Sequence, residues 1–170
     1  CQEQYQFILA DEMQDTNAVQ YEIIKLIGAR YKNVFVVDDP LQNIFMWRGS
    51  DNKFVMNFDE DWPNARIIHL NKNYRSSQNI VTAANHFAEC IPESKHRHYV
   101  ESIADKKRFE EPQYTRYDDE NAEASGIAKK IQTYIELGYN YKDIAILTRT
   151  NAQLQNFETA LYRSEIPYSI

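Results

Sequence analysis

Two pairs of acidic residues follow short apolar runs in this sequence. Asp11 and Glu12 come after residues 7–10, and Asp38 with Asp39 comes after residues 34–37. At the carboxyl end of a strand, one carboxylate can hold Mg²⁺ while its neighbour orients or deprotonates the attacking water in phosphoanhydride hydrolysis. A bare acidic pair could instead cap the following helix, so Asp11 and Glu12 alone leave both interpretations open.

A glutamine and an aromatic, basic set follow the second acidic pair. Gln42, just beyond a strand end, could sense a γ-phosphate by hydrogen bonding. Phe45 and Trp47 offer faces for base stacking, which tolerates any base sequence, and Arg48 lies beside them. Core packing is the alternative fate of such aromatic residues.

Two further segments carry groups that suit a nucleotide or nucleic acid. In LNKNYRSS, residues 70–77, Tyr74 could stack on a planar ring and Arg75 could reach a phosphate with its bidentate fork. In DIAILTRTN, residues 143–151, Arg149 and Asn151 follow an apolar run at the end where open α/β sheets bind ligands. Surface solvation and helix capping are the ordinary alternatives for these residues.

Short apolar runs next to amphipathic segments predict an α/β fold with a parallel sheet that positions these groups. The expected strands are residues 7–10, 34–37, 67–70 and 144–147, and the expected helices are residues 17–29, 77–90, 121–137 and 152–162. Asn17, and Ser76 or Ser77, are the expected helix caps, with Gly138 closing the third helix. Residues 91–112 show no clear pattern and are expected to form a loop or hairpin.

Composition narrows the class of protein. The chain has 170 residues with 43% hydrophobic residues, a net charge of −6 and a pI near 5.2, which excludes a broad basic surface that coats nucleic acid. Any nucleic-acid site must therefore be local. Cys1 and Cys90 form no metal-ligand pattern, and Cys90 is expected to be a small buried hydrophobe. No signal peptide or membrane-spanning run is visible, so a soluble, cytoplasmic, monomeric chain without membrane contact is expected.

Taken in order, DEMQDTN, VVDDPLQNIFMWRGSD, LNKNYRSS and ILTRTNAQ resemble consecutive parts of the UvrD/Rep-type superfamily 1 DNA helicases. The resemblance covers nearly the whole chain, and two specific elements about thirty residues apart make chance agreement implausible. It implies RecA-like, P-loop NTPase-type parallel sheets flanked by helices. It also implies a motor that hydrolyses ATP while moving along single-stranded DNA, typically from 3′ to 5′.

The resemblance assigns nucleotide roles to five residues. Asp11 matches the Mg²⁺ position and Glu12 the water-activating one. Gln42 matches the γ-phosphate sensor that couples nucleotide to DNA. Tyr74 matches a residue that stacks on adenine, and Arg75 matches an arginine that reaches the γ-phosphate.

The resemblance also assigns a DNA-contacting role to a second set of residues. Phe45, Trp47 and Arg48 match residues that contact DNA bases and backbone, and Arg149 and Asn151 match DNA-contacting positions of the second motor domain. The departures are few. Phe45 stands where Tyr is common, and Asp38 stands where the family usually has Gly, which could weaken nucleotide binding by like-charge repulsion.

The phosphate-binding (Walker A) loop is missing from this sequence, because none of its four glycines is followed by lysine. We therefore expect a fold that is incomplete at both ends. Residues 1–70 would be the C-terminal part of a first RecA-like domain, and residues 71–170 the N-terminal part of a second. Such a fragment should not turn over ATP alone.

Three other functions compete with this interpretation. The first is a helicase-like module that binds DNA or a partner but has lost catalysis. The second is a metal-dependent nuclease, which would gather carboxylates around metal ions but leave Gln42, Trp47 and Arg48 unexplained; its acidic residues would be Asp11, Glu12, Asp15, Asp38 and Asp39. The third is zinc binding by Cys90, His96 and His98, which offers only three ligands at an unusual spacing.

Overall fold

The computed structural model describes residues 2–95 and 99–170. It divides into two compact units, Cys1–Pro112 and Gln113–Ile170, each described below by itself. The elements combine helices with two small parallel sheets, which confirms the expected mixed α/β character in this coarse sense. Within the described ranges, no helix is both long and apolar enough to cross a membrane.

The first sheet pairs β1 (Ile8–Ala10) with β2 (Val34–Val36) in parallel, with Ile8 opposite Val34 and Ala10 opposite Val36. The connection between them contains α1 (Ala18–Gly28). Asn17 caps α1 as predicted: its Oδ1 accepts the Gln20 N–H at 3.0 Å, and Gln20 Oε1 accepts the Asn17 N–H at 3.0 Å. These two bonds fix where the chain turns from the strand end into the helix.

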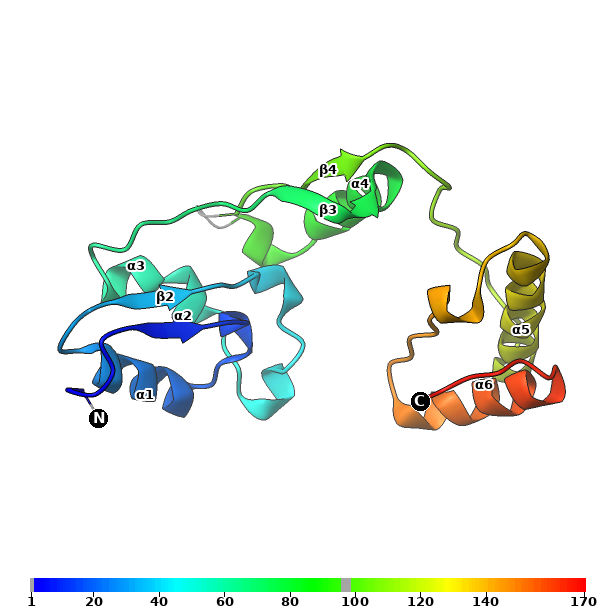
Figure 1. Cartoon of the computed structure of the whole chain (residues 1–170), viewed down its shortest axis with the longest axis horizontal. Helices are drawn as coiled ribbons and strands as arrows, with labels where there is room; N and C mark the ends of the chain where they lie inside the picture. The colour runs from blue at the N-terminus through cyan, green and yellow to red at the C-terminus, as the bar shows by residue number, and fades with distance from the viewer. Residues whose placement is uncertain (1, 96–98) are drawn as a thin grey trace. The chain divides into compact units, whose positions relative to one another are not determined.

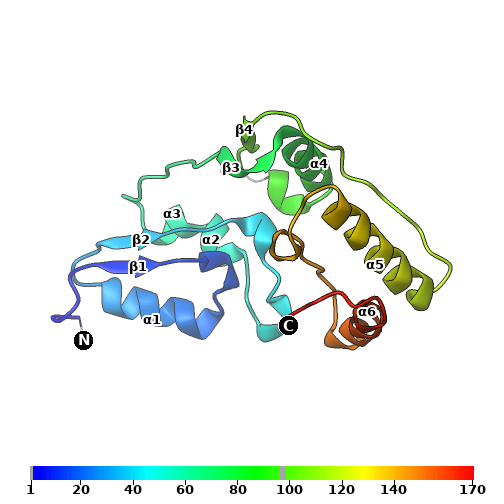
Figure 2. The ribbon, with the colours of Figure 1, turned by 45° about the vertical axis from the view of Figure 1, so that its right-hand side comes forward.

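Helices lie on both sides of this strand pair. In Figures 1 and 2, α1 lies on one side, while α2 (Lys53–Met56) and α3 (Phe58–Asp61) lie on the other. The buried Tyr21 hydroxyl donates to Asp61 Oδ2 at 2.8 Å, which fastens α1 to α3. Three short 3₁₀ turns complete this region: η1 (Met13–Asp15), η2 (Pro40–Gln42) and η3 (Met46–Arg48).

The second sheet of this unit pairs β3 (Lys72–Ser77) with β4 (Ile103–Lys106) in parallel. Helix α4 (Gln78–Ala88) follows β3 directly, and the turn η4 (Pro92–Lys95) comes after it. The sequence prediction was wrong here in two respects: residues 67–70 form no strand, and residues 91–112 include β4. Residues 67–70 are exposed and make no ladder, so their apolar character alone does not produce a strand.

The second unit consists of α5 (Glu120–Glu136), the turn η5 (Tyr141–Asp143) and α6 (Asn151–Arg163). Its core is the cluster Ala128, Ile131, Leu161 and Ile166, with Ile144 and Ile146 packed against it. Gly138 follows α5 with φ of +95°, a conformation that suits glycine. Residues 144–147, expected to form a strand, are not in one, because no neighbouring strand pairs with them in the described part of the chain.

Cys90 is free and exposed, so the expectation of a buried hydrophobe was wrong. The buried positions of α4 are Asn79, Val81 and Ala88, and Cys90 lies beyond the helix end, off that face. His96 and His98 of the zinc alternative lie outside the described residues. Within the described ranges, no group of three or more His, Cys, Asp or Glu could hold a metal ion by itself.

Candidate functional site

Asp11 and Glu12 occupy the turn that leaves β1. Glu12 adopts a left-handed conformation, with φ of 51° and ψ of 46°, and its N–H donates to Asp11 Oδ1 at 3.0 Å. The next residue, Met13, is buried and donates its N–H to the Val37 carbonyl at 3.0 Å, just past the end of β2. The two acids are thus held at the carboxyl end of the strand pair, with both side chains exposed.

Gln14, to which the sequence analysis gave no role, joins the ends of the two strands. Its side chain is 1% exposed. Gln14 Nε2 donates to Glu12 Oε2 at 2.6 Å, and Gln14 Oε1 accepts the Asp39 N–H at 3.1 Å. An amide following the acidic pair by two residues was the only signal in the sequence, and it did not reveal which groups the amide would contact.

Asp39 extends this set of contacts to Gln42. Asp39 Oδ2 accepts from Gln42 Nε2 at 2.7 Å, and Asp39 Oδ1 accepts the Leu41 N–H at 3.0 Å. Glu12, Gln14, Asp39 and Gln42 therefore form one continuous hydrogen-bonded set, which we call the carboxylate–amide chain. Both Asp39 oxygens already have donors, so this carboxylate serves as a positioning group more readily than as a free metal ligand.

An open depression of about 400 Å³ lies beside the two acids and is lined by Asp11, Glu12, Asp15, Thr16 and residues of α1. One Asp15 carboxylate oxygen is buried there without a hydrogen-bond partner in the described part of the chain. Mg²⁺ in nucleotide sites is usually bound by one or two carboxylates together with water and phosphate oxygens. The Asp11 carboxylate fits that requirement, because the Glu12 N–H occupies Oδ1 and not Oδ2.

Phe45, Trp47 and Arg48 come together around η3. The Arg48 guanidinium lies 4.4 Å from the Trp47 ring centroid and 5.1 Å from that of Phe45. Trp47 is 73% exposed, so this residue is not part of the core. The loop is held by Asn43, whose Oδ1 accepts the Phe45 N–H at 3.1 Å and the Ser50 hydroxyl at 2.7 Å. The result is an exposed, cationic aromatic surface on a fixed loop.

Tyr74 and Arg75 lie on β3, in the other sheet of the same unit. Asn73 Oδ1 accepts the backbone N–H groups of Arg75 and Ser76 at 3.0 and 2.9 Å, at the irregularity in the β3–β4 register. Tyr74 is 65% exposed, with the Lys72 ammonium 5.0 Å from its ring centroid. Among the described residues, no hydrogen bond or ion pair joins Arg75 to Asp11, Glu12 or Gln42.

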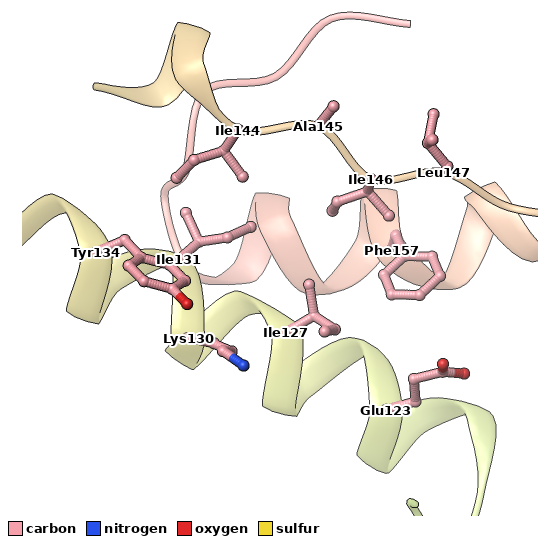
Figure 3. Close-up of a pocket in the computed structure, with 10 residues that line it drawn as sticks. All are labelled: Glu123, Ile127, Lys130, Ile131, Tyr134, Ile144, Ala145, Ile146, Leu147 and Phe157. Atoms are coloured by element: carbon pink, nitrogen blue, oxygen red, sulfur yellow. The ribbon is translucent and has the colours of Figure 1, made fainter. Parts of the chain in front are cut away.

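Arg149 and Asn151 lie in the second unit, at the start of α6, and both are exposed. Thr150 between them is the capping position, and its N–H donates to Gln153 Oε1 at 3.0 Å. A largely apolar hollow of about 300 Å³ lies in this unit. Figure 3 shows its lining side chains, which come from α5, residues 144–147 and α6. Glu123 and Lys130 supply its charged groups, and the other lining residues are Ile127, Ile131, Tyr134, Ile144, Ala145, Ile146, Leu147 and Phe157.

Two carboxyl groups of this unit have a lowered pKa: Asp51, whose pKa is lowered mainly by its hydrogen bond with Lys53, and Asp61 beside Tyr21. Desolvation raises the pKa of Asp61, but hydrogen bonds from Tyr21 and Lys25 outweigh it and hold that pKa below the usual range. Burial, followed by the contact with Asp61, raises the pKa of the Tyr21 hydroxyl. This cluster joins α1 to α3.

Comparison with known families assigns both halves of the chain. Residues 1–63 match the UvrD/REP helicase N-terminal domain, and residues 68–170 match the UvrD-like helicase C-terminal domain. The compact units of the structure divide after Pro112 instead, and the domain boundary after Leu70 stays a prediction.

Curated relatives agree over almost the full length of the chain. The chain is 38% identical over 169 residues to the ATP-dependent DNA helicase PcrA of Staphylococcus epidermidis, covering 99% of this chain and 23% of that protein. It is 39% identical to PcrA of Leuconostoc citreum, again over 99% of this chain and 22% of the relative. A probable DNA helicase II homolog of Mycoplasma capricolum is 37% identical over 98% of the chain and 23% of its own length.

The chain thus spans about a quarter of the length of the curated relatives it matches. The resemblance first drawn from four short motifs is confirmed by matches that run through the whole sequence. This chain belongs to the UvrD/Rep-type family of helicases.

Proposed function

We propose that this chain is part of an ATP-driven motor that moves along single-stranded DNA, with RecA-like domains and 3′-to-5′ polarity. One observation carries the proposal: Glu12 at the end of β1 and Gln42 beyond β2 belong to a single carboxylate–amide chain. ATP hydrolysis requires a group that orients the attacking water and groups that contact the γ-phosphate, and this chain of hydrogen bonds joins a candidate for each role. Relatives named as ATP-dependent DNA helicases support it.

Glu12 is proposed to orient the attacking water and accept its proton as the bond to the γ-phosphate breaks, giving ADP and phosphate. Asp11 would hold Mg²⁺, which supplies charge neutralisation at the phosphates when bound. Gln42 would hydrogen-bond the γ-phosphate. Tyr74 would stack on adenine, and Arg75 would pair with phosphate oxygens when the motor closes around nucleotide.

The surface around η3 is proposed to bind single-stranded DNA. Phe45 and Trp47 would stack on bases, and Arg48, now lying over both rings, would move to the DNA backbone. Arg149 and Asn151 would add contacts from the second unit. Because only Arg48 and Arg149 among these groups are cationic, DNA binding should be local and only modestly sensitive to salt, and the net charge of −6 agrees with a local site.

We also propose that the 170-residue chain does not hydrolyse ATP by itself and works as a monomeric segment of a longer cytoplasmic protein. Residues 1–170 contain no Walker A sequence to cradle the phosphates. Asp38, which stands where the family usually has glycine, favours one alternative: a helicase-like module that binds DNA or a partner without turnover.

The test is single-turnover ATP hydrolysis, with and without single-stranded DNA, by this chain and by its full-length parent. We expect DNA-stimulated hydrolysis in the parent only. Glu12→Gln should reduce it on the order of 10²- to 10⁴-fold, because a general base is lost while shape is kept. Full-length protein that binds DNA but never hydrolyses ATP would establish the inactive module instead.

A further inference from the structure

We infer that Gln14 is a positioning residue, which orients the Glu12 carboxylate and couples it to Gln42 through Asp39; the inference rests on the proposed function. Gln14 is among the largest fully buried side chains of the molecule, beside Met13 and Tyr21, and it alone of the three ends in an amide. A buried amide is costly unless both its ends are hydrogen-bonded. A packing role alone would be filled better by an apolar side chain.

The two ends of the amide contact different parts of the site. The donor end meets the Glu12 carboxylate at 2.6 Å, and the acceptor end meets the Asp39 N–H at 3.1 Å. Reversing the amide would place an oxygen against a carboxylate and an N–H₂ group against an N–H. Both contacts therefore require this one orientation.

The Glu12 side chain needs a hydrogen bond that fixes its orientation. Its backbone is fixed by its left-handed conformation and by the Asp11 contact, yet its side chain is exposed. Gln14 Nε2 is the side-chain donor that the structure gives to its carboxylate. A general base must be held within hydrogen-bond reach of the proton it removes. Without Gln14 the carboxylate would sample several rotamers.

The same amide connects Glu12 to the phosphate sensor. Asp39 presents its N–H to Gln14 and its Oδ2 to Gln42. When Gln42 turns toward a nucleotide it releases Asp39 Oδ2, and a shift of the Asp39 backbone reaches Glu12 through a single buried side chain. Gln14 thus makes the orientation of the base depend on whether the sensor is engaged.

The experiment uses the full-length parent and the variant Gln14→Met, which keeps the side-chain length and removes both hydrogen bonds. We expect kcat for ATP to fall on the order of 10- to 100-fold, as for other residues that orient a catalytic group, while KM for ATP changes less than about twofold. In the Glu12→Gln background the same substitution should cause no further loss, because Gln14 acts through Glu12. Tyr21→Phe, another buried polar deletion, is the matched control and should keep kcat.

Three outcomes would overturn the inference. Unchanged kcat in Gln14→Met, while Glu12→Gln abolishes turnover, removes Gln14 and leaves the proposed function intact. A loss that adds fully to that of Glu12→Gln means Gln14 only supports the fold. Full turnover by Glu12→Gln rejects the proposed role of Glu12 first, and this inference with it.

A second variant covers the case in which Gln14→Met does not fold. Gln14→Glu keeps the acceptor for the Asp39 N–H and replaces the donor by a carboxylate oxygen. With an acceptor in place of the donor to Glu12, kcat for ATP should fall as in Gln14→Met. A kcat equal to that of the parent overturns the inference.

Discussion

The two compact units bury different kinds of side chain. In the second unit, the buried side chains of the α5–α6 pair are alanine, isoleucine and leucine. The first unit buries the polar Gln14, Ser50 and Asn79 as well as the apolar Met13, Tyr21, Val81 and Ala88. A core of aliphatic residues stabilises the fold but does not orient polar groups. Buried amides, in contrast, fix the direction of the groups to which they hydrogen-bond. The buried polar groups of the first unit hold the proposed catalytic side chains in place. The packed core of the second unit supports the exposed Arg149 and Asn151.

The largest expected effect concerns the scaffold. Ile131→Ala should lower the free energy of unfolding of the second unit by about 2–5 kcal/mol, since a buried isoleucine leaves a cavity. Hydrogen exchange on the chain is the measurement, with protection lost in residues 113–170. Leu137→Ala, at a position 68% exposed, is the matched control. Equal loss of protection in residues 2–95 would break the distinction between the units.

The next effect concerns the exposed aromatic surface of the first unit. Trp47→Ala in the full-length parent should weaken single-stranded DNA binding by about 1–3 kcal/mol, the usual value of one base stack. Fluorescence anisotropy with a labelled oligonucleotide measures it. Phe87→Ala, which removes an equally exposed ring on α4, should leave affinity unchanged. Similar losses in both variants would mean that Trp47 has no special role.

A smaller effect belongs to the buried polar contact between α1 and α3. Tyr21→Phe should lower the free energy of unfolding by about 1 kcal/mol, because one hydrogen bond to a partly exposed carboxylate is lost. The raised pKa of Tyr21 adds a pH dependence. Its contribution is complete below the ordinary tyrosine pKa of 10.0 and declines as pH rises above it.

Urea unfolding across this alkaline range measures both parts of the Tyr21 prediction. The unsubstituted chain should lose stability more steeply above the ordinary tyrosine pKa than Tyr21→Phe does. Superimposable curves for the two proteins would show that the contact with Asp61 contributes nothing to folding, and parallel curves with an offset would contradict the pH dependence alone.

The smallest expected effect tests the departure at Asp38. Removing its charge should lower KM for ATP in the parent by a factor of about 2 to 5, the size of an exposed like-charge interaction. Asp38→Asn and Asp38→Gly should act alike if charge is the cause. A change in Asp38→Gly alone would point to backbone freedom instead, and a higher KM in both would show that Asp38 supports the site.

Local signals explain which elements the sequence predicted well. The helix after Asn17 begins where its capping residue and Gln20 require, and α5 and α6 match their predicted ranges within a residue or two. These signals lie within a few residues of each other, so tertiary context is not needed to interpret them.

Elements that depend on distant partners were predicted poorly. Residues 67–70 and 144–147 are apolar enough for strands but lack a neighbour to pair with in the described chain. β3, with the polar sequence KNYRSS, becomes a strand because β4 lies beside it. The same limit applies to the site: the acidic pair and Gln42 are visible as motifs, whereas Gln14 gains its role only when two strand ends meet.

The left-handed backbone at Glu12 bears on the stability of the turn that carries it. A residue other than glycine or asparagine loses about 1–3 kcal/mol in such a conformation. Glycine adopts the same angles freely, so Glu12→Gly should raise the free energy of unfolding while it removes the carboxylate proposed to act on water. The proposed catalytic side chain is thus carried at a cost to folding stability.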